Sequence, residues 1–394
     1  MSPRTLRLAC ASLFCVAFAA SAAPYTPASD AQVLERLPIR PADPLARELR
    51  SLRADLAAHP GDASLAESLA RRYFDLAMAE GDPRYIGYAE AALQPWKGAK
   101  TLPPDLLVIR ALLSQYKHDF AGALKDLGAA IDAEPRNVEA HAWRAAIFMV
   151  QADYAGARSE CAALAPESTE LFAAGCFAYV DATTGKTREA YERLAAALKR
   201  HPEASAGLRL WNLTRLAEMS RRLGDAAATE KHFRAALGLG VTDNFLLAAY
   251  ADFLLEQKRP AEVVELLRDW ARSDTLLLRL AIAEATLKAP TAAQRIQALD
   301  DRFSEAALRG EQLHLQEEAR FRLHLKNDPT GALRRASENW KSQREPRDAG
   351  ILLEAALAAR NRAAAQPALD WLAQSGFEDP AMRRIAGEVE ALPK

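Results

Sequence analysis

Histidine and carboxylate side chains near the C-terminus come closest to the pattern of a chemically active site. His314 lies about one helical turn before Glu317 and Glu318, and His324 follows ten residues after His314. Imidazole and carboxylate groups on one helix face can hold a metal ion. A ten-residue step, however, places His324 on a different face of a helix from His314. We therefore interpret these side chains as the solvated face of an amphipathic helix and expect no metal site.

The sequence contains none of the short motifs that position a catalytic group. There is no HExxH metal-binding helix, no glycine-rich phosphate loop of the GxGxxG or Walker type, and no GxSxG turn for a nucleophilic serine. The 18 glycines are scattered along the chain. We therefore expect a protein that is not an enzyme and that binds neither a metal nor an organic cofactor.

Two cysteines carry the remaining candidate chemistry. Cys161 and Cys176 are predicted to lie near the end of one helix and early in the next, so antiparallel packing could bring them together. Closing a loop of about 15 residues would stabilise the chain by about 3 kcal/mol in the chain-entropy model. The alternative is a pair of buried free thiols, because cysteine packs as a small apolar residue.

The N-terminus has the pattern of a secretory signal. Arg4 and Arg7 precede an apolar run over 8–20, and small residues at 20 and 22 suit cleavage after Ala22. The run of roughly 13 residues is shorter than the roughly 20 that span a bilayer. We therefore predict a signal peptide over 1–22, followed by a proline-rich flexible leader over 23–44. Together with the alanine- and arginine-rich composition, this favours export to the periplasm of a Gram-negative bacterium.

The charges of the chain are balanced. Lys and Arg total 51 against 52 Asp and Glu, so the formal charge is −1. Nucleic-acid binding needs a basic excess that neutralises the phosphate backbone. We therefore expect no nucleic-acid partner. Aromatic residues make up 7% of the chain, a share that suits helices packed through small side chains.

Small and aromatic residues recur with a period of 34. Ala89, Ala123 and Ala157 are spaced by this step, and Phe120 and Tyr154 repeat it three positions upstream of two of them. A fixed period of this length is typical of a helical repeat array, in which each helix pair buries its apolar face against a stacked neighbour.

The stretch 105–135 shows one repeat in full. Asp105 can cap a first helix, a turn follows at 117–119, and a second helix ends at Pro135. The residues at the small, aromatic and proline positions are Ala111, Phe120, Ala123, Ala130 and Pro135. This spacing resembles the tetratricopeptide repeat (TPR), closely over about 105–202, less closely over 62–100 and 205–272, and weakly beyond 275. The chain is similar to TPR proteins that bacteria secrete.

The resemblance implies an all-α fold, a right-handed α-solenoid of roughly ten antiparallel helix pairs. No run of alternating β-branched residues interrupts the helical pattern, so we expect no strand. We predict regular TPR-like repeats over 45–289 and degenerate repeats that continue the solenoid over 290–394.

The resemblance also implies which residues line the concave groove of the solenoid. Carried over by position, a partner-binding groove would include an apolar and aromatic middle and an arginine pair at one end. These residues are Tyr116, Met149, Phe172, Tyr179, Trp211, Arg221 and Arg222. Such a strip suits a helix or an extended peptide with a few bulky anchors.

The sequence therefore favours an exported scaffold that binds a peptide or helix segment of a partner in the cell envelope. A second hypothesis is an accessory or regulatory subunit of an envelope enzyme complex. A third, a carrier of a small molecule or metal, would use the irregular C-terminal half. The identity of the partner is not encoded in any motif of the chain.

Overall fold

The computed structural model describes residues 29, 31–32, 43–99, 101–310 and 313–393. The predicted signal peptide and almost all of the predicted leader lie outside these residues. The chain divides into two units, residues 1–48 and 49–394. Helix α1 begins in the first unit and ends in the second. The description below concerns the second unit.

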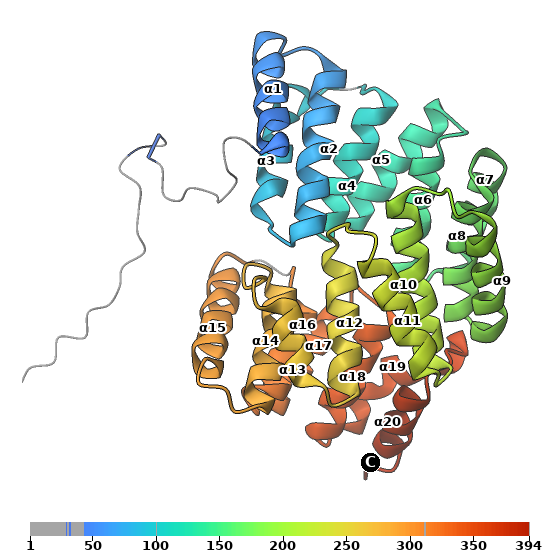
Figure 1. The fold of residues 1–394 in the computed structure, drawn as a ribbon, viewed down its shortest axis with the longest axis vertical. Coiled ribbons are helices and arrows are strands. Elements are labelled where there is room, and N and C mark those ends of the chain that lie inside the picture. The colour runs from blue at the N-terminus through green and yellow to red at the C-terminus, as the bar shows by residue number, and fades with distance from the viewer. Residues whose placement is uncertain (1–28, 30, 33–42, 100, 311–312, 394) are drawn as a thin grey trace, which may run out of the picture. The chain divides into compact units, whose positions relative to one another are not determined.

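Helices account for all of the regular structure in the described residues (Figure 1). Two short 3₁₀ helices, Gln94–Trp96 and Ala165–Glu167, accompany the α-helices. The α-helices are α1 Pro44–Ala58, α2 Ala63–Glu80, α3 Arg84–Ala92, α4 Pro104–Tyr116, α5 Phe120–Ala133, α6 Val138–Val150, α7 Tyr154–Leu164, α8 Glu170–Thr183, α9 Thr187–Arg200, α10 Ala206–Arg222, α11 Ala226–Leu237, α12 Asn244–Glu256, α13 Pro260–Leu267, α14 Asp274–Thr286, α15 Ala292–Leu308, α16 Leu315–His324, α17 Pro329–Asn339, α18 Pro346–Ala358, α19 Arg362–Ser375 and α20 Pro380–Glu390.

The described helices α2 to α19 form nine antiparallel pairs, and the first helices of successive pairs stack on one another. The pairs continue past residue 290 as α16 with α17 and α18 with α19. The prediction of an all-α solenoid of helix pairs is confirmed, with nine pairs described against roughly ten expected.

The turn inside each pair is built in the same way along the whole array. Each contains one residue in the left-handed region, with φ between 51° and 79°. These residues are Gly81, His118, Ala152, Gly185, Gly224, Lys258, Lys288, Asn327 and Arg360. In five of the nine turns an Asp or Asn follows and caps the second helix by accepting a backbone N–H. The C-terminal pairs therefore share their turn geometry with the N-terminal ones.

The alanines of the 34-residue repeat are buried between packed helices. Ala89, Ala123 and Ala157 are fully buried, and Ala111 and Ala145 are buried on the facing first helices. A methyl side chain lets two helix backbones come close, and the neighbouring aromatic residues fill the remaining space. The 34-residue period of the sequence therefore reflects the regular recurrence of buried alanines in the core.

The array of helix pairs curves so that the pair α12–α13 approaches the pair α2–α3. Gly81, at the end of α2, lies so near the N-termini of α12 and α14 that a Cβ there would be 2.5 Å from the Ser273 hydroxyl oxygen and 2.8 Å from the Asn244 side-chain oxygen. We call α2 to α15 the first coil and α16 to α20 the second coil. The second coil returns along the edge of the first that carries the turns of the pairs α4–α5, α6–α7 and α8–α9.

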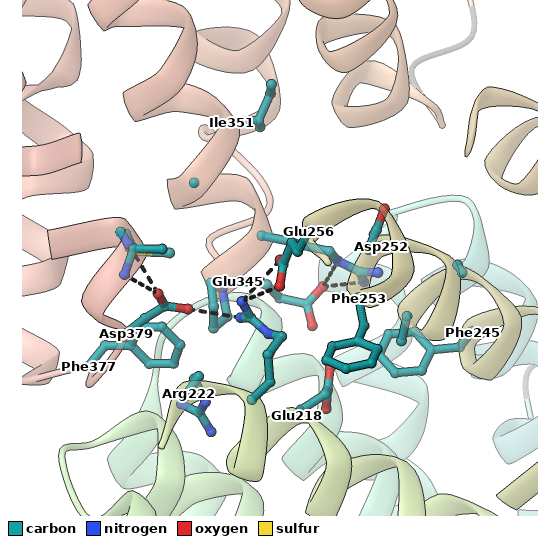
Figure 2. Close-up of a pocket in the computed structure, with 18 of the residues that line it drawn as sticks. Glu218, Arg222, Phe245, Asp252, Phe253, Glu256, Glu345, Ile351, Phe377 and Asp379 are labelled. Atoms are coloured by element: carbon teal, nitrogen blue, oxygen red, sulfur yellow. Dashed lines mark hydrogen bonds and ion pairs between the residues drawn. The ribbon is translucent and has the colours of Figure 1, made fainter. Parts of the chain in front are cut away.

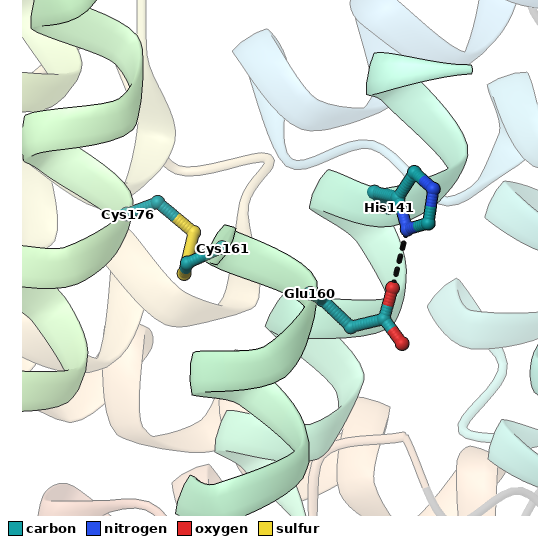
Figure 3. Close-up of a disulfide and its surroundings, with 4 residues drawn as sticks. All are labelled: His141, Glu160, Cys161 and Cys176. Carbon is teal, nitrogen blue, oxygen red and sulfur yellow. Dashed lines mark hydrogen bonds and ion pairs between the residues drawn. A yellow bond between two sulfur atoms is a disulfide. The ribbon is translucent and has the colours of Figure 1, made fainter. Parts of the chain in front are cut away.

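Cys161 of α7 and Cys176 of α8 form a disulfide across neighbouring repeats (Figure 3). Both side chains are buried. Beside the disulfide, the buried Glu160 carboxylate lies 2.5 Å from Nδ1 of His141, and the other ring nitrogen of His141 is 3.1 Å from the Pro135 carbonyl oxygen. These contacts fix the position of α7 between α6 and α8.

Candidate binding cavity

Polar contacts join the second coil to the first. The Arg344 N–H donates to the Val150 carbonyl oxygen at 2.7 Å, and the Trp371 indole N–H donates to the Tyr154 hydroxyl at 2.7 Å. Among the described residues in and around the apolar core of the second coil, Ala152 alone comes from the first coil. Near α18 to α20 the coils therefore meet along a seam of largely polar contacts, whereas Phe321 of α16 packs in an apolar cluster with α14 and α15 of the first coil.

A cavity of about 480 Å³ remains between the two coils. Its wall is formed by α8, α10, α12 and α14 on the first-coil side and by α16, α18, α20 and the segment before α20 on the second-coil side. Figure 2 shows Phe245 and Phe253 on one side of this space and Glu345 and Phe377 among the residues that bound it. A volume of this size lies within the range of roughly 300–1,000 Å³ that is typical of ligand sites.

Alternating aromatic rings and guanidinium groups cross the cavity from one coil to the other. Arg215 lies over the Tyr179 ring at 3.9 Å from its centroid and over the Phe245 ring at 5.4 Å. Arg347 of the second coil approaches the same Phe245 ring at 5.5 Å. The Tyr179 hydroxyl donates to the Glu345 carboxylate at 3.0 Å. Each cation–π contact contributes about 0.5–2 kcal/mol, depending on how far water is excluded.

The carboxylates of the cavity are held in their charged form by arginines. Burial opposes ionisation of Glu345, but Arg347 at 2.6 Å keeps the pKa of this carboxyl below its ordinary value. Burial likewise opposes ionisation of Asp252, and Arg279 at 2.7 Å with Arg320 at 2.9 Å lowers its pKa well below the ordinary value. Carboxylates held in this way suit electrostatic recognition better than proton transfer near neutral pH.

Two adjacent arginines at the end of α10 have different surroundings. Arg221 forms ion pairs with Glu256 at 3.1 Å and with Asp379 at 2.8 Å. Arg222 instead donates to the Ala182 carbonyl oxygen at 2.8 Å and lies 4.6 Å from the centroid of the Phe377 ring. Burial lowers the pKa of Arg222 to about 10, which still leaves it charged at neutral pH.

The residues predicted to line one open groove have three different locations. Tyr179, Arg221 and Arg222 line the cavity, where all three contact the second coil. Phe172 and Trp211 pack against each other with ring centroids 5.8 Å apart and, with the half-buried Tyr116, lie outside the cavity lining. Met149 is only 3% exposed and belongs to the apolar core around the disulfide, so it offers no surface to a partner.

The sequence interpretation missed the residues that the second coil brings to the cavity. Glu345, Arg347, Phe377 and Asp379 lie more than 100 residues from the first-coil residues that they contact. The 34-residue period places residues within one repeat and its neighbours, but it carries no signal for contacts between coils. Phe245, at the start of α12, could have been found by continuing the positional assignment one repeat further.

Metal ligation and membrane crossing both lack a structural basis within the described residues. No group of three or more His, Cys, Asp or Glu side chains there could hold a metal ion. None of the helices described is both long and apolar enough to cross a bilayer.

The chain has only low similarity to known proteins. No protein-family model and no curated protein matches the chain. Among solved structures, a chain of the Naa15/Naa10 complex bound to HypK-THB is 14% identical with a TM-score of 0.25; the match covers 88% of this chain and 63% of that one. The TPR domain of P58(IPK) is 15% identical with a TM-score of 0.23, covering 88% and 93%. The present chain therefore spans less than two thirds of the first of these, and at such scores neither bears on function.

Proposed function

We propose that the chain is a non-catalytic scaffold that binds a segment of a partner protein in the cavity between its two coils. The observation that carries this proposal is the composition of the cavity wall, in which three aromatic rings alternate with or adjoin arginines from both coils. Aromatic and arginine side chains dominate the energetic centres of protein interfaces, because each combines a large contact area with directional polar contacts. The signal-like N-terminus supports export, so the proposed partner is a protein of the cell envelope.

The shape of the wall supports an extended or helical segment as the ligand. The ladder of Tyr179, Arg215, Phe245 and Arg347 offers ring faces and guanidinium planes in succession, and these accept apolar anchors and carboxylates along a chain. The paired carboxylates on the same wall would orient basic groups of the segment. The cavity thus combines aromatic surfaces that would hold the partner segment with charged groups that would determine its orientation.

Crosslinking with the purified chain in an envelope fraction tests the proposal. The bait is compared with Phe245→Ala, which removes the shared ring of the ladder, and with Tyr88→Ala, a matched control at a 47% exposed position on α3. We expect a partner that crosslinks to the parent chain and to Tyr88→Ala but is lost with Phe245→Ala, while circular dichroism shows unchanged helicity. Recovery of the same proteins with all three baits would contradict binding in the cavity, and so would recovery of none.

A further inference from the structure

Four successive residues between α19 and α20 each meet a residue of the first coil. A Cβ at Gly185 would lie 3.1 Å from the Gly376 carbonyl oxygen, so the two backbones are in close contact. The Phe377 ring lies under the guanidinium of Arg222. The following two residues carry carboxylates, and both accept hydrogen bonds from the first coil. We call residues 376–379 the latch segment.

The two carboxylates of the latch segment bind different kinds of donor. Glu378 accepts the backbone N–H of Thr187, the first residue of α9, at 2.9 Å. Asp379 accepts from the Arg221 guanidinium at 2.8 Å, while it also caps α20 through the N–H groups of Ala381 and Met382. The first coil thus presents a helix N-terminus and two guanidinium groups to an aromatic–acidic–acidic sequence.

The receiving surface is part of the cavity wall already described. Arg221, Arg222, Phe377 and Asp379 all line the cavity, and Figure 2 shows Phe377 and Asp379 on one side with Arg222 near the Phe377 ring. Glu378 is exposed to solvent. Phe377, Asp379 and the Thr187 that receives Glu378 are buried, so a partner gains the receiving surface only when the latch segment opens.

The latch segment makes these contacts as irregular backbone between two helices, the form in which a linear peptide is recognised. We propose that the first-coil residues that hold it, Gly185, Thr187, Arg221 and Arg222, form a binding site for an extended partner segment in which an aromatic residue precedes two acidic residues. The chain's own latch segment occupies this site in the structure, and the partner segment replaces it. This inference rests on the proposed function and specifies the chemistry of the partner.

Replacement requires the exchange of two polar contacts and one buried ring. Water or the partner can satisfy the groups of the Glu378 hydrogen bond and of the Asp379 ion pair. The Phe377 ring, which is 2% exposed, leaves Arg222 when the segment opens, and the aromatic residue of the partner takes its place there. Opening also separates Phe377 from Trp371, whose ring centroids are 5.3 Å apart, while the rest of the apolar core of the second coil stays packed. A local opening of residues 376–379 therefore exposes less apolar surface than unfolding of either coil.

A peptide added in trans tests the site directly. The probe is a fluorescent peptide with the sequence of residues 374–381, titrated by anisotropy into the purified chain. The chain variant Glu378→Gln, Asp379→Asn weakens the internal latch while the Asn side chain still caps α20. We expect this variant to bind the peptide at least tenfold more tightly than the parent chain, because the internal competitor is weakened.

Three further chain variants and one altered peptide separate binding at the site from general effects. Arg384→Gln changes an exposed α20 residue whose ion-pair partner, Glu388, lies on the same helix, and it should leave peptide affinity unchanged. Adding Arg222→Gln to the latch variant should weaken binding at least tenfold. Arg222→Lys in the same background should give intermediate affinity, because it keeps the charge and loses the planar stack. A peptide with Gln and Asn at the two acidic positions should bind at least tenfold more weakly than the parent peptide.

The proposal is overturned if the latch variant binds the peptide no better than the parent chain, while hydrogen exchange at the Thr187 amide is faster than in the parent. It is also overturned if the Gln and Asn peptide binds equally well. These results leave the proposed function intact if the envelope partner still depends on Phe245. Conversely, peptide binding at Arg222 together with no Phe245-dependent partner would retain this site and contradict the wider cavity.

Discussion

Buried alanines set how closely the two helices of a pair approach. Ala123 is fully buried between α5 and its neighbours, whereas Ala121, two positions away on the same helix, is exposed. Ala123→Leu should lower the free energy of unfolding by about 1–3 kcal/mol, because added methylenes in a close-packed site force backbone shifts. Ala121→Leu is the matched control and should change it by less than about 0.5 kcal/mol. Equal effects in urea unfolding would contradict the packing role of the small residue.

His118 makes the seam sensitive to acid. Burial lowers its pKa to about 4, and the charged groups around it are Glu317, Glu345, His314 and Arg347. An unfolded histidine titrates near pH 6.5, so protonation favours unfolding as the pH falls from 6.5 towards 4. We expect the contribution of His118 to the free energy of unfolding, taken as the difference between the parent chain and His118→Asn, to decrease over this window.

The control for this pH dependence is His118→Asn, a neutral residue that tolerates the φ of 61° at this position. Burial and the neighbouring Glu345 raise the pKa of Asp348 to about 7, so this residue acts in the opposite sense: its contribution to stability is lost as the pH rises through 7. Asp348 is present in both the parent chain and His118→Asn, so its contribution cancels when their free energies of unfolding are subtracted. Identical pH profiles from denaturant unfolding would show that His118 does not titrate in this way.

At the scale of elements, the disulfide links two neighbouring repeats through α7 and α8. It closes a loop with a sequence separation of 15 residues. Replacing both cysteines with alanine should lower the free energy of unfolding by about 3 kcal/mol, mainly because the unfolded chain regains the freedom of the loop. Thiol labelling of the unreduced, unfolded chain after removal of residues 1–22 should find almost no free thiol. Two free thiols per chain would contradict the pairing.

The turns inside the pairs show how far local sequence specifies an element. Asp119 and Asp153 follow residues in the left-handed conformation and cap the next helix, and Asp328 and Asn361 do the same in the C-terminal pairs. This recurrence is visible in the sequence, and it marks repeats of the same kind within the stretch 290–394 that we predicted to be degenerate. Buried alanines line the core there as well, namely Ala332, Ala336, Ala365 and Ala368.

At the scale of the whole unit, the effect of the contact between the coils can be distinguished from the effect of backbone strain. The comparison uses two glycines that lie in equivalent turns. Gly185 and Gly224 have φ values of 79° and 78°. A Cβ at Gly224 would meet no atom within 4 Å, whereas one at Gly185 would meet the Gly376 backbone of the second coil. Both Gly→Ala variants should lose about 1–2 kcal/mol from left-handed strain.

Only Gly185→Ala should also loosen the seam. We expect faster hydrogen exchange at the amides of residues 376–379 in this variant and no change there in Gly224→Ala. If exchange rises equally in both variants, the close approach of Gly185 and Gly376 does not hold the coils together. The comparison uses the intact chain, so it reports the contact rather than the folding of either coil alone.

The sequence by itself determined the helices, their pairing and their buried small residues, because these depend on interactions within about 34 residues along the chain. It also supplied the cysteine pair and the arginine pair as candidates. Only the tertiary structure places the second coil opposite α8, α10, α12 and α14 of the first coil, with the cavity between them. Residues such as Tyr179 and Glu345 meet across 166 positions, and their contact depends on small rotations added up over many repeats. No single residue encodes that sum, so the cavity and its latch emerge only when the whole array is assembled.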